Sequence, residues 1–230
     1  GTSSFTTAQD NQAITLDTTT NALTGAVSFT TNGTTGNVTI DNGTTALNIA
    51  ASSIDGNLTA TSGAAAGIID SGTMTVTGAG TFATDANNGV LDLGTLLVSG
   101  ALTLNTNGNG AATIVNATAI VLAANANIGG ATSITATTGD ITDSGTFVVG
   151  GTSSFTTTQA DADIDLGTLA STGAVTLSTN GTSADATVVN SIALGLGTVG
   201  VGRNLVATAT TGTITDSGVI TVGGTSSFTT

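Results

Sequence analysis

The sequence predicts an all-β fold and, within that class, a right-handed parallel β-helix (β-solenoid) rather than a β-sandwich. Three observations lead to it: a long internal repeat, short segments in which apolar and polar residues alternate, and turn residues at short intervals. The chain is rich in Val, Ile and Thr, which favour strands, and its 230 residues include 33 Gly and no Pro. Helix caps followed by apolar residues at a period of 3.6 are not found.

The internal repeat has a constant period. The tripeptide Asp-Ser-Gly begins at Asp70, Asp143 and Asp216, so each copy starts 73 positions after the one before. The heptapeptide Gly-Thr-Ser-Ser-Phe-Thr-Thr opens the chain at 1–7 and recurs at 151–157 and 224–230. A fixed period of this length is typical of solenoid architectures, in which each repeat packs only on its neighbours.

Aligning the heptapeptides with Gly78 divides the chain into repeat units. The units are 1–77, 78–150 and 151–223, and residues 224–230 start the next one. Because the sequence opens and closes on the same heptapeptide, we predict that residues 1–230 form a single β-solenoid segment of a longer array.

The number of turns of the coil, or rungs, in one unit follows from corresponding apolar residues. Phe155, Leu177, Leu205 and Phe228 lie at successive intervals of 22, 28 and 23 positions, which together make one unit. About three rungs per unit are therefore expected. Four rungs of about 18 residues also fit, because Gly- and Thr-rich sequence permits several registers.

The expected strands and turns can be placed along the chain. Residues 73–77, 163–166 and 174–178 alternate apolar and polar side chains, so one side of each strand can be buried. Asn-Gly pairs supply the positive φ that tight corners require, and they begin at Asn32, Asn42, Asn107, Asn109 and Asn180.

Large apolar residues at equivalent places in successive units should point into the coil. The two sets are Met74, Phe147 and Ile220, and Phe5, Phe82, Phe155 and Phe228. Their burial must offset the conformational entropy of the chain, because there is no Cys to form a disulfide.

The composition argues against catalysis and against several kinds of partner. There is no His, Cys, Tyr, Glu or Lys, so the usual groups for proton transfer and nucleophilic attack are missing, and we expect neither an enzyme nor a cofactor. A net charge of −13, with Arg203 as the one basic residue, predicts no binding to nucleic acid. The longest apolar stretch, near 117–124, is far shorter than the roughly 20 residues of a membrane-spanning helix, so no membrane insertion is expected.

Three acidic residues form the one candidate metal site. Asp161, Asp163 and Asp165 alternate with apolar residues, which would place three carboxylates on one face of a strand, and Ca²⁺ is the metal that they suggest. Ca²⁺ takes 6–8 oxygens, whereas such a strand spreads its carboxylates over roughly 13 Å, so other loops or chains would have to contribute. A solvated acidic face is the favoured interpretation.

Other polar residues have structural interpretations. The recurrent Asp70, Asp143 and Asp216 are expected at corners, each accepting hydrogen bonds from backbone N–H groups two residues on. Arg203 aligns with uncharged residues and should point outward, with an intermolecular salt bridge as the alternative.

Thr-x-Thr pairs are similar to the flat Thr arrays of ice-binding solenoids. They occur at Thr59/Thr61, Thr135/Thr137 and Thr208/Thr210. The pairs are interrupted and shift in register along the sequence. Ordinary strand composition is therefore the favoured interpretation.

Each unit resembles a known family of repeats. The segments 202–205, 214–218 and 220–224, which read Gly-Arg-Asn-Leu, Ile-Thr-Asp-Ser-Gly and Ile-Thr-Val-Gly-Gly, resemble the β-strand repeats of filamentous-haemagglutinin-like adhesins, which are very large secreted bacterial exoproteins. The resemblance implies a β-helical shaft, exported through an outer-membrane pore and placed outside the cell or on its surface. It would serve as a stalk, an adhesin body or a fibre of a biofilm matrix.

We therefore expect a structural extracellular protein. Its main partner would be itself, by end-to-end or lateral association or as part of a giant chain, and host or neighbouring-cell surfaces are further partners that an adhesin implies. The alternatives are a solenoid that binds ice or carbohydrate and a calcium-bridged surface-layer or matrix protein. An enzyme built on the same fold is the weakest alternative.

Overall fold

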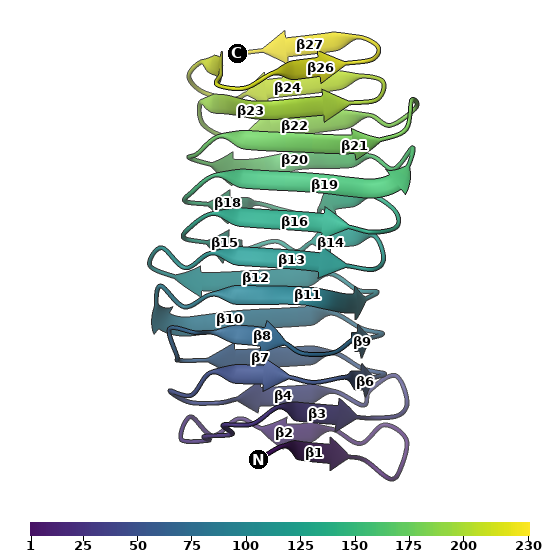
Figure 1. The fold of residues 1–230 in the computed structure, drawn as a ribbon, viewed down its shortest axis with the longest axis vertical. Helices are drawn as coiled ribbons and strands as arrows, with labels where there is room; N and C mark the ends of the chain where they lie inside the picture. The colour runs from purple at the N-terminus through teal and green to yellow at the C-terminus, as the bar shows by residue number, and fades with distance from the viewer.

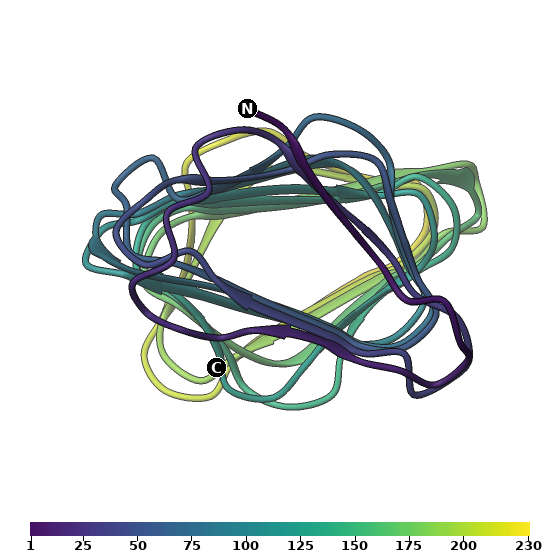
Figure 2. The same cartoon turned by 90° about the horizontal axis from the view of Figure 1, so that it is seen from below.

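The computed structural model describes all 230 residues as one coil of 27 β-strands, without helices. The strands form two sheets that face each other across the coil (Figure 2). In Figure 1 the strands of one sheet run to the right in front and those of the other run to the left behind while the chain climbs, which makes the coil right-handed. The predicted parallel β-helix is confirmed. The structure contains no helix that could cross a membrane.

The first sheet, called sheet A, has 14 strands. They are β1 (Ser3–Thr6), β3 (Val27–Thr30), β5 (Leu47–Ile49), β6 (Ser52–Ile54), β8 (Ile68–Asp70), β9 (Met74–Val76), β11 (Leu91–Val98), β13 (Ala112–Asn116), β16 (Thr132–Ala136), β19 (Ser153–Ala160), β21 (Val175–Asn180), β23 (Leu194–Val201), β25 (Ile214–Asp216) and β26 (Ile220–Val222).

The second sheet, called sheet B, has 13 strands. They are β2 (Ile14–Leu16), β4 (Val38–Asp41), β7 (Leu58–Ser62), β10 (Gly80–Asn87), β12 (Leu102–Asn107), β14 (Ile120–Leu122), β15 (Ala126–Ile128), β17 (Ile141–Asp143), β18 (Phe147–Val149), β20 (Ile164–Ser171), β22 (Ala186–Asn190), β24 (Leu205–Ala209) and β27 (Ser226–Thr229).

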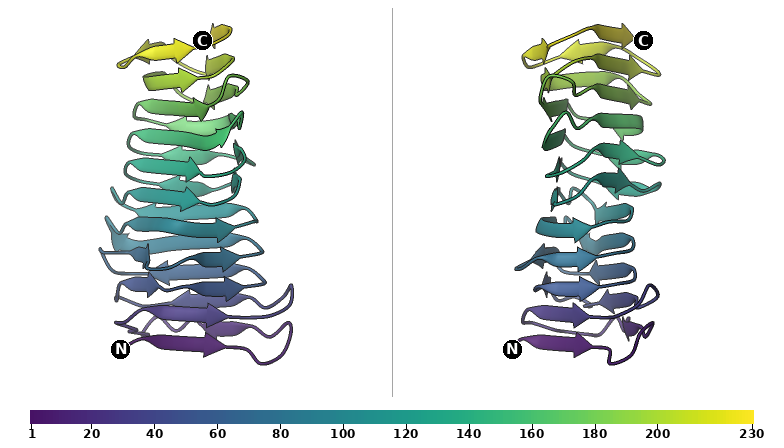
Figure 3. Two further views of the ribbon diagram at one scale, coloured as in Figure 1. Left: turned by 45° about the vertical axis from the view of Figure 1, so that its right-hand side comes forward. Right: turned by 90° about the vertical axis from the view of Figure 1, so that its right-hand side faces the viewer.

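The strands stack in about 11 turns along one axis (Figure 3). Some turns contain two short strands in place of one long strand, such as β17 and β18, which both pair with β20. The interval between paired residues of adjacent turns varies, from 19 positions between Ala186 and Leu205 to 24 positions between Ser3 and Val27. At about 4.8 Å per turn, the coil is roughly 50 Å long.

One 73-residue unit spans three and a half turns. From β10, which contains Phe82, three turns lead through β12 and β15 to β18, and a further half turn leads to β19, which contains Phe155. Equivalent residues of consecutive units therefore alternate between the sheets: Phe5 and Phe155 lie in sheet A, and Phe82 and Phe228 in sheet B. The estimate of three rungs was half a turn short, because the 28-residue step from Leu177 to Leu205 includes a change of sheet.

The interior of the coil is apolar. A single cluster of 45 buried residues, mostly Val, Leu, Ile, Ala and Phe, fills it from Val27 to Ala209. Of the residues expected to point inward, Met74, Phe82, Phe147 and Phe155 are fully buried, and Phe5 and Ile220, in the end turns, pack against the cluster while partly exposed. Phe228 is 48% exposed because it lies in the last turn, with no further turn above it.

Most of the expected Asn-Gly corners have the expected backbone. The glycines of four pairs have positive φ: Gly33, Gly43, Gly108 and Gly181. Gly110 does not have a positive φ. Glycine is needed there because adjacent turns stack closely, and a Cβ would lie 2.1 Å from the Gly89 carbonyl oxygen.

Candidate functional site

Acidic and amide side chains form an axial ladder at the corner that precedes sheet B. The side-chain oxygen of each residue accepts a hydrogen bond from the backbone N–H of its counterpart one turn on. Asp140 accepts from Asp163 at 2.8 Å, Asp163 from Asp185 at 2.7 Å, and Asp185 from Asn204 at 3.0 Å. These oxygens satisfy backbone donors that lie just before the strands begin, so the ladder stabilises the stacking of turns.

The three candidate calcium ligands do not share a strand. Asp165 alone lies in β20, while Asp161 sits in the preceding turn with a φ of 62° and accepts a hydrogen bond from the Ser183 N–H at 2.9 Å. Asp163 is a member of the corner ladder. No three acidic side chains in the structure are grouped so that they could hold a metal ion. The expected single strand face is therefore wrong, because the turn at Asp161 interrupts it.

Arg203 forms an ion pair within the chain. Its Nε donates to Asp185 Oδ1 at 2.7 Å and its Nη2 donates to Asp185 Oδ2, so the guanidinium and the carboxylate form a bidentate contact. The side chain points outward, as expected, but its partner is intramolecular. The pair adds one positive charge beside a ladder that stacks Asp140, Asp163 and Asp185 on consecutive turns, where like charges repel.

The Arg203 hydrogen bond lowers the pKa of Asp185 from 3.8 to about 2, and a backbone hydrogen bond from Asn204 acts in the same direction. Because the folded-state pKa is depressed, the stabilisation is complete above pH 4 and is lost as the pH falls through 2. We expect Arg203→Gln to return the Asp185 pKa toward its ordinary value, as measured by a carboxyl-carbon NMR titration. Arg203→Lys, which keeps the charge but not the two-nitrogen geometry, should give an intermediate pKa, and an unchanged value in both variants would contradict the assignment.

The recurrent Asp of Asp-Ser-Gly holds a β-bulge of the next turn. In β20 the pairing register shifts between Leu166 and Leu169, and the extra residues Gly167 and Thr168 lie outside the regular ladder. Asp143 accepts from the Gly167 N–H at 3.0 Å, from the Thr168 N–H at 2.8 Å and from the Thr168 hydroxyl at 3.0 Å. Its carboxylate thus replaces the carbonyl acceptors that the bulge forfeits.

The same arrangement occurs one unit earlier. Asp70 accepts from the Gly94 N–H at 2.9 Å and from the Thr95 N–H and hydroxyl at 2.7 and 2.8 Å, and β11 carries the matching bulge. The expectation of a corner role within two residues was wrong, since the donors lie 24 and 25 positions ahead. Sequence position alone does not show which residues the stacking of turns brings together.

Asp216 is a natural control for this arrangement, because it belongs to the last turn and makes no side-chain hydrogen bond. We expect Asp143→Ala to lower the free energy of unfolding by about 1 kcal/mol, since two bulge N–H groups lose a charged acceptor at a partly exposed site. Asp216→Ala should leave it unchanged. Chemical denaturation of both variants measures the difference, and equal effects would refute the assigned role of Asp143.

A fully buried Asn recurs in each unit, and this recurrence was not identified from the sequence, where only Asn42 was noted, as part of an Asn-Gly pair. Asn116 is the last residue of β13, and its Oδ1 accepts from the Val98 N–H at 2.8 Å. Its Nδ2 donates to the carbonyls of Val98, Thr118 and Ala119 at 3.0, 3.3 and 3.1 Å. Asn42 and Asn190 make the corresponding bonds to Leu23 and Ser171.

These asparagines satisfy backbone groups where the chain turns a corner inside the coil. The signal that could have found them is their regular spacing, because Asn42, Asn116 and Asn190 recur at equal intervals of 74 positions and each follows an apolar strand. An amide is suited to the place because it offers an acceptor and two donors at once.

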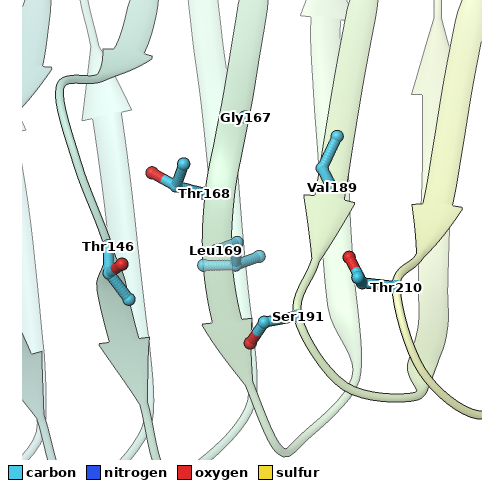
Figure 4. Close-up of a pocket in the computed structure, with 7 residues that line it drawn as sticks. All are labelled: Thr146, Gly167, Thr168, Leu169, Val189, Ser191 and Thr210. Atoms are coloured by element: carbon cyan, nitrogen blue, oxygen red, sulfur yellow. The ribbon is translucent and has the colours of Figure 1, made fainter.

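Two outward hollows lie beside the bulges. The first has a cavity volume of about 210 Å³ on sheet B and is shown in Figure 4; its walls are Thr146, Gly167, Thr168, Leu169, Val189, Ser191 and Thr210. The second, of about 130 Å³ on sheet A, is lined by Thr73, Gly94, Thr95, Leu96, Val115, Ala117 and Thr137. Member by member, the residues of the two hollows are 73 or 74 positions apart.

A third hollow, of about 260 Å³, differs from these two. Its lining includes Asp41 of the first unit and Asp85 of the second. Position 41 corresponds to Val115 and Val189 in the later units, so this hollow does not recur.

The fold and these recurrent contacts define the class of protein: a β-solenoid built from repeats. Residues 35–90, 109–178 and 183–230 match a family described as repeats of unknown function (DUF5649). The chain belongs to this family. The matched segments begin at equal intervals of 74 positions, close to the spacing of the Asp-Ser-Gly tripeptides. No curated protein and no solved structure matches the chain significantly.

Proposed function

We propose that the protein is a structural shaft, part of an extracellular bacterial fibre, stalk or adhesin body whose function is length, stiffness and self-association. The observation that carries the proposal is the direction of its polar contacts. The strand hydrogen bonds, the corner ladder and the Asp contacts to the bulges all run from one turn to the next, along the axis. A rod held in this way is stiff along its axis and can be extended by adding turns.

The last turn of residues 1–230 can accept a further turn of the same coil. In the last turn, Phe228 is 48% exposed, whereas its counterpart Phe155 inside the coil is fully buried, and the free edges of β26 and β27 present unpaired backbone groups. Another turn of the same kind, from a continuation of the chain or from a second copy, would cover Phe228 and pair with the edges, as a neighbouring turn does everywhere else in the coil. The resemblance to filamentous-haemagglutinin-like repeats supports the same role and a place outside the cell.

The test is the length of the particles in solution. Electron microscopy and sedimentation over a range of concentrations should show rods that lengthen with concentration. Adding charge at the last edge, with Ser226→Lys and Phe228→Lys, should keep the rods short, whereas Val206→Lys on the lateral surface of β24 should not. Particles that stay at about 11 turns at every concentration, in all variants, would overturn self-association.

One observation favours a second candidate function, the binding of ice. The outward residues Thr15, Thr39, Thr59, Thr81 and Thr103 pair in unbroken register over five consecutive turns of sheet B. Threonines were expected to shift in register, but their unequal intervals of 24, 20, 22 and 22 positions hide this ladder in the sequence. Hydroxyl and methyl groups repeating about every 4.8 Å offer a periodic surface.

Thermal hysteresis of the freezing point tests this candidate. We expect hysteresis for the natural chain and its loss in Thr59→Tyr, which disrupts the centre of the ladder. Thr187→Tyr, an outward change on β22 of the same sheet, is the matched control. No hysteresis in the natural chain would eliminate ice binding and leave the shaft proposal intact.

A further inference from the structure

We propose that the hollow beside each Asp-held bulge is a binding site for a neutral saccharide, present once per unit and on opposite faces of the shaft in consecutive units. We call the two hollows the β20 groove and the β11 groove, after the strands that carry their bulges. Their recurrence is the first observation: both have the same bulge, the same Asp contact and a lining that differs at one position, where Ser191 of the β20 groove corresponds to Ala117 of the β11 groove.

The second observation is the glycine at the centre of each groove. At nearly all other glycines a Cβ would meet neighbouring atoms closely, because adjacent turns approach each other there. At Gly94 a Cβ would meet nothing within 4 Å, and at Gly167 it would meet only Asp143 Oδ1, at 3.8 Å. Neither residue has a positive φ. Packing therefore does not require glycine at these two positions. Because glycine has no side chain, the space above the bulge stays open.

The lining specifies the chemistry of the ligand. Thr146, Ser191 and Thr210 are exposed and carry hydroxyls that can donate or accept, while the half-buried Val189 supplies an apolar surface between them (Figure 4). A sugar ring has the same character, with apolar C–H faces and a rim of hydroxyls. The Asp143 carboxylate already accepts three hydrogen bonds, and the chain has a net charge of −13, which repels anionic ligands. A neutral saccharide fits this combination.

The grooves also have a direction and a spacing. The β20 groove takes residues from beside β18, β20, β22 and β24, so it runs along the axis over four turns, or about 14 Å, and suits a short stretch of an extended glycan. The two grooves lie on opposite sheets and are separated by three and a half turns, or about 17 Å along the axis. One shaft could therefore hold two polysaccharide chains, one on each face.

The experiment is an NMR titration of the isotope-labelled chain with three neutral disaccharides: maltose, cellobiose and N,N′-diacetylchitobiose. We expect at least one of them to shift the amide signals of Thr95 and Thr168 together. Gly94→Val and Gly167→Val should each abolish the shift at their own groove, because the new side chain fills the open space. Gly200→Val is the matched control, since Gly200 lies in β23 and its Cβ would also meet nothing within 4 Å.

A second measurement tests the arrangement on two faces. Mixing the chain with a long polymer of the disaccharide that binds should raise light scattering through cross-linking, and either single groove variant should reduce that rise at least tenfold. Binding that survives in the double variant Gly94→Val/Gly167→Val would overturn the site, as would the absence of shifts with all three sugars. The site does not require self-association, so it can fail while the proposed shaft stands, and the reverse also holds.

Discussion

Replacing Phe155 by Ala should lower the free energy of unfolding by about 3–5 kcal/mol, among the largest effects of any single change in this chain. Phe155 lies in β19, is fully buried, and packs edge-on against Phe147 with their ring centroids 6.3 Å apart. Its neighbours are strands of the turns above and below, which cannot close over the vacated space without breaking their own pairing. Chemical denaturation, followed by circular dichroism, measures the change.

The chain offers a matched control for this substitution. Phe228 occupies the same place in an identical heptapeptide, but it lies in the last turn and is 48% exposed. Phe228→Ala should therefore cost much less than Phe155→Ala. Equal losses would mean that the sequence of the heptapeptide, and not its burial between turns, decides its contribution to stability.

Replacing Asn116 by Ala should cost about 2–4 kcal/mol, because the change leaves the N–H of Val98 and the carbonyl of Ala119 without their partner inside the coil, while the Val98 carbonyl keeps the Thr118 hydroxyl. Each unpaired buried group costs about 1–3 kcal/mol before the structure relaxes. Hydrogen exchange offers a second readout. Protection should fall first at the corner after Val98, since a solenoid loses structure locally.

Asn109→Ala is the control for this prediction. Asn109 lies at an exposed corner, and its side chain makes no hydrogen bond within the protein. Its replacement should change the free energy of unfolding by less than about 0.5 kcal/mol. If Asn116→Ala proved as mild as Asn109→Ala, the buried amide would not be needed to satisfy the corner.

Much of the fold could be predicted because a solenoid uses local patterns. The apolar residues alternate in nearly every strand, so the inward side chains of Met74, Phe82, Phe147 and Phe155 were identified without coordinates. The Asn-Gly pairs marked four corners, because positive φ is a property of the residue itself. The 73-residue period of the sequence is also found in the structure.

Contacts between turns could not be predicted in the same way. Asp143 contacts residues 24 and 25 positions ahead, Asp185 pairs with Arg203 across one turn, and the Thr ladder joins residues at unequal intervals. Each depends on a turn length that varies along the coil, and a shift of one residue would reverse which side chains face outward.

The sequence by itself determined that this protein is a repetitive β-solenoid with an apolar interior, because alternation and periodicity are local properties of the chain. Only the tertiary structure decided that a unit makes three and a half turns, so that equal sequences come to lie on opposite sheets. The physical reason is that both sheets bury every second residue in the same way. The pattern of the sequence therefore marks a strand without saying on which face of the shaft it will lie.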